Sequence, residues 1–153
     1  MQILGIRTSP TAVRFAIVNW DGQAATVLNT TTENKLDFPA SKTTSAEKLH
    51  WVRGELLRLI RQNPNVERIA IKCSEFGVGR ERSASREAAY LDAAVLLVAG
   101  ETNLPVEMLL YRAIGTKRDE VKKFAENNVG KGEPYWNEQM ADAIAVAFAA
   151  RNH

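Results

Sequence analysis

The chain has 153 residues, of which 45% are hydrophobic and 25% are charged, and its formal net charge is +2 at pH 7. These values are typical of a globular domain of ordinary size and exclude a mostly disordered chain. The small net charge does not indicate a nucleic-acid or membrane partner by itself. The single cysteine, Cys73, excludes an internal disulfide framework, and with only two histidines a Cys/His zinc cluster is excluded as well.

The sequence shows no signal for export or for insertion into a membrane. Its first residues lack a basic segment followed by a long apolar run. The longest apolar runs, residues 93–100 and 143–150, are far shorter than the roughly 20 residues that span a bilayer. We therefore expect a cytoplasmic protein with no membrane partner, built as one domain over residues 1–150.

The first third of the chain predicts three strands joined as a meander. Residues 3–6 form a short apolar run, and residues 13–18 alternate partly and are rich in β-branched side chains. Asp21-Gly22 is a strong hairpin turn signal that leads into a return strand at residues 25–28. The polar stretch 29–42 predicts a loop or an irregular edge strand.

The rest of the chain predicts alternating helices and strands. The spacing of a capping box occurs at Thr44 with Glu47 and again at Thr116 with Asp119, and Gly100 is a good C-terminal stop for a helix. The expected elements are a helix from Thr44 to Asn63, a strand at 68–72, a helix at 85–99, a strand at 106–110, a helix from Thr116 to about residue 127, and a last helix capped by Asn137 that ends at residue 150.

This order of elements predicts an α/β fold with a mixed sheet. An antiparallel meander comes first, and crossover helices then make the later strands parallel to the first strand, with helices on both faces of the sheet. That is the element order of the ribonuclease H-like fold.

Several segments carry a resemblance to one family within this fold. They are Ile3-Leu4-Gly5-Ile6 in the first strand, the helix at 85–99 with Leu104-Pro105-Val106 after it, Gly115-Thr116-Lys117, and Ala141-Asp142-Ala143 with the alternating apolar and Ala positions that follow. In this order they are similar to the RuvC-type Holliday junction resolvases, and the resemblance covers most of residues 1–150.

The resemblance implies a metal-dependent phosphodiesterase site that this sequence has largely lost. In the family, four carboxylates hold two Mg²⁺ ions, which are hard cations that require oxygen ligands. Here Arg7 stands at the first-strand position, Lys72 at the second, and Gln139 at the third, three residues before Asp142. Because only Asp142 remains, the resemblance implies a catalytically degenerate, non-enzymatic member that uses no metal cofactor.

Two interpretations of the cations stay open at this stage. Arg7, Lys72 and Asp142 converge in the fold that the resemblance implies, and Glu75 or Glu138 completes the neutralisation of a metal-free ionic cluster. The alternative is that Arg7 and Lys72 extend to solvent from the ends of their strands.

The same resemblance places two basic segments at the border of a substrate cleft. The residues expected to contact nucleic-acid phosphates are Arg80, Arg82, Arg86, Lys117 and Arg118. Acidic residues are interleaved with them, so an ordinary solvated face is the alternative. Trp51, Tyr135 and Trp136 are able to stack on bases, but packing in the core or in an interface is the favoured interpretation.

Two other functions are kept as alternatives to nucleic-acid binding by an inactive domain. One is a nuclease with relocated ligands, which would use Asp142, Glu75, Glu138 and Glu87. The other is a protein-interaction module. The helix at 85–99 is apolar on more than one face, so it is either buried or half of a helix–helix interface, and the resemblance implies a homodimer.

Overall fold

The computed structural model describes residues 1–75 and 83–153, so the predictions for Arg80 and Arg82 lie outside the described residues. Its strands are β1 (Gln2–Thr8), β2 (Ala12–Trp20), β3 (Ala25–Val27), β4 (Lys35–Asp37), β5 (Val66–Lys72) and β6 (Val106–Leu109). They form one sheet in the order β3-β2-β1-β5-β6, and β4 also pairs with β2. The pairs β1–β2, β2–β3 and β2–β4 are antiparallel, whereas β5 is parallel to both β1 and β6.

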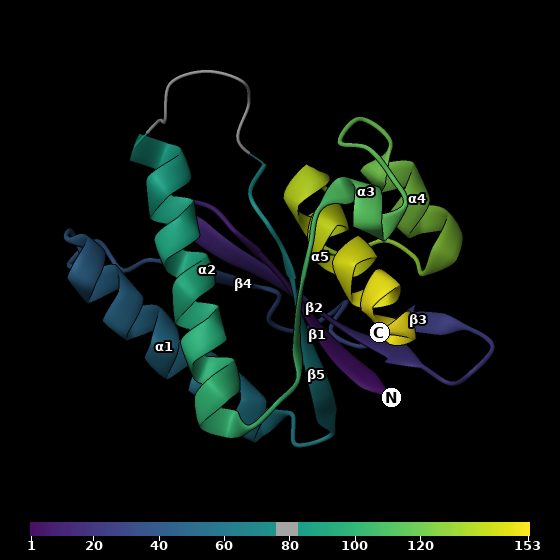
Figure 1. Ribbon diagram of the computed structural model, residues 1–153, viewed down its shortest axis with the longest axis horizontal. Coiled ribbons are helices and arrows are strands. Elements are labelled where there is room, and N and C mark those ends of the chain that lie inside the picture. The colour runs from purple at the N-terminus through teal and green to yellow at the C-terminus, as the bar shows by residue number, and fades with distance from the viewer. Residues whose placement is uncertain (76–82) are drawn as a thin grey trace.

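Helices cover both faces of this sheet (Figure 1). The helices are α1 (Ser45–Gln62), α2 (Ser83–Thr102), α3 (Tyr111–Ile114), α4 (Val121–Asn128) and α5 (Glu138–Ala149), followed by a 3₁₀ turn (Ala150–Asn152). α1 and α2 pack together on one face, and α5 lies across β1 and β2 on the other face with α4 against it. The predicted fold class, a mixed sheet of ribonuclease H-like order with helices on both faces, is confirmed. No helix of the described residues is long and apolar enough to cross a membrane.

Two of the predicted helix caps are present in the structure. The Thr44 hydroxyl accepts a hydrogen bond from the amide of Glu47, and the Glu47 carboxylate accepts one from the amide of Thr44, so a complete capping box begins α1. The Asn137 side chain accepts a hydrogen bond from the amide of Met140 at 2.9 Å and begins α5.

Two other predicted helix boundaries are wrong. α2 continues through Gly100 to Thr102 and stops at Asn103, which takes the left-handed backbone conformation (φ 54°) that asparagine tolerates. Thr116 does not cap a helix: its hydroxyl donates to the Lys117 carbonyl at 3.4 Å, and α4 begins only at Val121, after Glu120.

α5 approaches β1 very closely, and a glycine makes this possible. A Cβ atom on Gly5 would overlap the Ala143 carbonyl oxygen and lie 2.8 Å from the Cβ of Ala147. The residues of α5 from Met140 to the end of the helix are buried, and most are small. This close approach brings Asp142, in the second turn of α5, down to the ends of β1 and β5.

Candidate functional site

Arg7, Lys72 and Asp142 lie together where β1 and β5 end and α5 begins. Arg7 Nε is 3.0 Å from Asp142 Oδ2, and the Asp142 side chain is completely buried. The Lys72 side chain is 1% exposed and that of Arg7 is 19% exposed. Neither cation therefore extends freely into solvent from the end of its strand. The structure shows the converged arrangement rather than two solvated side chains.

Asp142 is held from two sides. Its Oδ1 atom accepts a hydrogen bond from the Tyr111 hydroxyl at 2.8 Å, while Oδ2 faces Arg7. Burial raises the pKa of Asp142 to about 6, although the charge of Arg7 and the Tyr111 hydrogen bond favour the ionised form. Burial and the neighbouring Asp142 also raise the pKa of the Tyr111 phenol, which therefore stays protonated as a donor.

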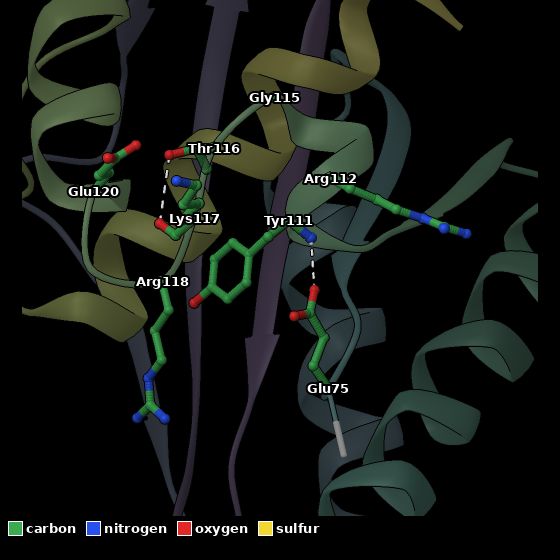
Figure 2. Close-up of a pocket in the computed structure, with 8 residues that line it drawn as sticks. All are labelled: Glu75, Tyr111, Arg112, Gly115, Thr116, Lys117, Arg118 and Glu120. Atoms are coloured by element: carbon green, nitrogen blue, oxygen red, sulfur yellow. Dashed lines mark hydrogen bonds between the residues drawn. The ribbon is translucent and has the colours of Figure 1, made fainter. Parts of the chain in front are cut away.

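Lys72 is enclosed by polar and aromatic groups. Its Nζ donates to the Cys73 carbonyl at 2.7 Å and to Glu75 Oε1 at 3.4 Å, and it lies 3.7 Å from the centroid of the Tyr111 ring. Burial lowers the pKa of Lys72, against the opposing charges of Asp142 and Glu75. Glu75 Oε1 also accepts from the Tyr111 amide at 2.7 Å (Figure 2). Tyr111 thus contacts Asp142 through its hydroxyl, and the Lys72–Glu75 pair through its ring and its amide.

The acid that completes the neutralisation is Glu75 and not Glu138. Glu138 accepts a hydrogen bond from Arg118 Nε at 2.8 Å, at the outer side of α5. Gln139 lies one turn before Asp142 and is partly exposed, and among the described residues its side chain has no hydrogen bond to the cluster. Arg7 makes its remaining contacts with Ser74 Oγ at 3.3 Å and the Lys72 carbonyl at 3.5 Å.

Sequence reasoning missed three members of this neighbourhood. Tyr111 follows directly after a strand and was not assigned to any element, because a four-residue helix leaves no periodic signal. On the opposite face, Thr8 Oγ1 donates to Asp92 Oδ1 at 2.6 Å, and burial raises the pKa of Asp92. The signal available for Asp92 was a carboxylate in the middle of the apolar helix at 85–99, after the last charged residue of its first turns.

The residues present do not fit a pair of Mg²⁺ ions. Among the described residues, no group of three or more His, Cys, Asp or Glu side chains is placed to hold a metal. Two cations occupy the strand ends, and both oxygens of Asp142 already face other groups. The carboxylates of a relocated site are engaged separately as well: Glu75 with Lys72 and the Tyr111 amide, Glu138 with Arg118, and Glu87 with the Ser45 hydroxyl.

A pocket of about 520 Å³ adjoins the cluster (Figure 2). Its lining residues are Glu75, Tyr111, Arg112, Gly115, Thr116, Lys117, Arg118 and Glu120. Arg112 points away from the Tyr111 ring on one side, and Arg118 lies on the other side. Lys117 and Arg118, both predicted as phosphate contacts, therefore line one pocket together. Arg86 lies in the first turn of α2 and is not among the lining residues.

Comparisons with known proteins identify the fold. No sequence model of a protein family matches the chain, and no curated protein sequence matches it either. The structure is similar to Thermus thermophilus RuvC, with a TM-score of 0.78 and 19% identity over 99% of this chain and 96% of that one. T. thermophilus RuvC in complex with a Holliday junction substrate gives a TM-score of 0.76 and 20% identity, with the same shares of both chains covered.

A yeast mitochondrial Holliday junction resolvase is also similar. Its TM-score is 0.63 at 14% identity, and the match covers 96% of this chain and 76% of that chain. Similarity at this level of identity reports the fold, and it extends over nearly the whole chain. The protein therefore has the ribonuclease H-like fold of the RuvC Holliday junction resolvases.

Proposed function

We propose that this chain is a catalytically inactive RuvC-like domain that binds nucleic acid. The observation that carries the proposal is the 3.0 Å pair between Arg7 Nε and the fully buried Asp142. In the resembled family, the corresponding positions hold carboxylates around metal ions. Here the guanidinium and the Lys72 ammonium supply positive charge beside Asp142 directly, and neither group can bind Mg²⁺.

Exposed cations beside this cluster support the binding part of the proposal. Arg112 and Lys117 are exposed at the pocket, and among the described residues neither forms an ion pair. Arg118 is paired with Glu138 at the same rim. Unpaired arginine and lysine side chains are suited to contact phosphates, which contribute affinity without sequence specificity. A T. thermophilus RuvC of the same fold has been solved with a junction substrate, which favours branched DNA as the first ligand to test.

Fluorescence anisotropy with labelled junction, duplex and single-stranded DNA tests this binding. We expect the logarithm of affinity to fall linearly with the logarithm of salt concentration, and the Arg112→Ala/Lys117→Ala double variant to reduce the slope by about 0.9 for each lost phosphate contact. Arg61→Ala is the matched control, because Arg61 is exposed at the end of α1 on the other face of the sheet. Binding by the double variant that equals wild type would contradict the proposal.

A cleavage assay separates the proposal from the relocated nuclease. Wild-type protein incubated with labelled junction and linear DNA in Mn²⁺ is expected to leave both intact. Cleavage that Asp142→Asn abolishes would favour the nuclease instead. Absence of DNA and RNA binding at every salt concentration would favour a protein-interaction module.

We further propose that two copies of the chain associate through α2. Tyr90, Leu96 and Leu97 are exposed on this helix at 41%, 37% and 56%, and the stretch 93–100, which contains the two leucines, carries no charge. An antiparallel second copy of α2 meets the same uncharged stretch, so a symmetric interface brings no like charges together there. Sedimentation should show a dimer that Leu97→Glu dissociates. Leu28→Glu, at an equally exposed leucine outside α2, should leave it intact.

A further inference from the structure

Four basic side chains form a row across the sheet on the face that α5 covers. Lys35 on β4 pairs in register with Arg14 on β2, and Arg14 pairs with Arg7 on β1. Lys72 on β5 follows Ile71, the register partner of Ile6, and so stands beside Arg7. The Arg7 and Lys72 part of this row belongs to the ionic cluster, whereas the Arg14 and Lys35 part lies outside it.

Three of these four cations have a carboxylate partner. Arg7 pairs with Asp142, Lys72 with Glu75 and Lys35 with Asp37. Among the described residues no carboxylate pairs with Arg14, the fourth member of the row. Like charges directly opposite each other on neighbouring strands destabilise a sheet, so Arg14 beside Arg7 is an unfavourable arrangement as it stands.

Arg14 is also buried with unmet hydrogen-bond donors. Arg14 is 8% exposed, and its Nε and Nη1 atoms have no hydrogen-bond partner among the residues that the structure describes. Buried polar groups in proteins are almost always hydrogen-bonded, and an unpaired one points to a missing ion or water. A buried, unpaired guanidinium is the least favourable case, because both its charge and its N–H groups have lost their hydration.

A tyrosine covers this guanidinium at the surface. Arg14 Cζ lies 4.8 Å from the centroid of the Tyr135 ring, and Lys35 Nζ lies 5.7 Å from it. Tyr135 is 49% exposed, so it does not pack in the core of the domain. A hydrogen bond from the Asn34 side chain to the Glu133 carbonyl, at 2.8 Å, joins the residues just before Tyr135 to the start of β4. The exposed ring of Tyr135 therefore lies over the Arg14 guanidinium.

We propose that Arg14, assisted by Lys35, binds a phosphate group at this point, and that the Tyr135 side chain moves aside to admit it. A phosphate oxygen pair matches the forked N–H groups of a guanidinium and supplies the negative charge that the row lacks. The neighbouring cations strengthen the local positive potential. This site is separate from the pocket of Figure 2, and it does not depend on nucleic-acid binding there. The phosphate is either a free anion or part of a nucleic-acid strand.

Calorimetric titration with inorganic phosphate, and with a short DNA strand with and without a 5′-phosphate, tests the site. Wild type should bind inorganic phosphate with saturation, and Arg14→Met should weaken this binding by about tenfold to a hundredfold. Tighter binding of the 5′-phosphorylated strand than of its unphosphorylated form would identify a strand terminus as the source. Equal binding of both strands, lost in Arg14→Met, would identify an internal phosphodiester.

Thermal unfolding distinguishes loss of the site from loss of the fold. In phosphate-free buffer Arg14→Met should unfold at the same temperature as wild type or higher, because it removes an unpaired buried charge. Added phosphate should raise the unfolding temperature of wild type and of Arg61→Ala clearly more than that of Arg14→Met. No saturable phosphate binding by wild type, or equal binding by Arg14→Met, would overturn the proposal even where junction binding persists. Junction binding by the Arg112→Ala/Lys117→Ala variant tests the proposed function and does not test the phosphate site at Arg14.

Discussion

The two faces of the central sheet are built in different ways from the same strands. Ile6 on β1 and Phe15 on β2 face α1 and α2 in a core of large apolar side chains. The residues that alternate with them, Gly5, Arg7 and Arg14, lie under α5 or beside its first turns. The face under α5 thus combines very close helix packing with buried charge. The comparison shows that large apolar side chains close one face, whereas close helix packing and ion pairs at the strand ends close the other.

The largest expected effect comes from breaking the ionic cluster on the α5 face. Asp142→Leu should lower the free energy of unfolding by about 3–5 kcal/mol, because it leaves the largely buried Arg7 without its carboxylate partner and removes a compensating negative charge near Lys72. Urea denaturation measures this change. The double variant Arg7→Met/Asp142→Leu should recover much of the loss. A cost below about 1 kcal/mol for Asp142→Leu would mean that the pair behaves like an exposed salt bridge.

The pH dependence of stability sharpens the comparison further. The folded pKa of Asp142 is raised from 3.8 to about 6, so the folded protein binds this proton more tightly than the unfolded chain does. The contribution of Asp142 to stability is then complete below about pH 4 and lost as the pH rises through 6. Relative to Asp142→Asn, wild type should lose about 3 kcal/mol between pH 4 and pH 7.

Chemical denaturation of both proteins across this pH range measures the difference. A stability difference that rises with pH would instead mean that Arg7 holds the pKa of Asp142 below its usual value.

A smaller effect is expected where α5 touches β1. Gly5→Ala should cost about 1–3 kcal/mol, because the added methyl group overlaps the Ala143 carbonyl and pushes α5 away from the sheet. Gly54→Ala in α1 is the matched control, since nothing lies within 4 Å of its added Cβ. It should stabilise the protein by about 0.5–1 kcal/mol through helix propensity. Equal effects of the two substitutions would show that close packing under α5 is not required.

Local signals in the sequence predicted most of the fold. The capping box at Thr44, the Asn137 cap and the hairpin turn at Asp21-Gly22 each depend on neighbours in the chain, and the structure contains all three features. The two wrong helix boundaries have different causes. At the end of α2, Asn103 rather than Gly100 takes the left-handed conformation, and at α4 the helix begins five residues after Thr116, beyond the reach of its hydroxyl.

The site was predictable only in part, for a physical reason. Arg7, Lys72 and Asp142 could be named because they stand at the positions where the resembled family carries its metal-binding carboxylates. Tyr111 could not, because its role depends on the three-dimensional position of a four-residue helix. The row that includes Arg14 and Lys35 depends on the pairing register of four strands, which could not be read from the local sequence signals.

Calorimetric titration of Mn²⁺ into the wild-type protein tests the central claim most directly. The paired cluster of Arg7, Asp142, Tyr111 and Lys72 predicts no saturable binding at the strand ends, because the one remaining carboxylate is already engaged by a cation and a hydroxyl donor. Asp142→Asn should then give the same titration as wild type. Saturable Mn²⁺ binding that Asp142→Asn abolishes would contradict the account and restore a metal site to this fold.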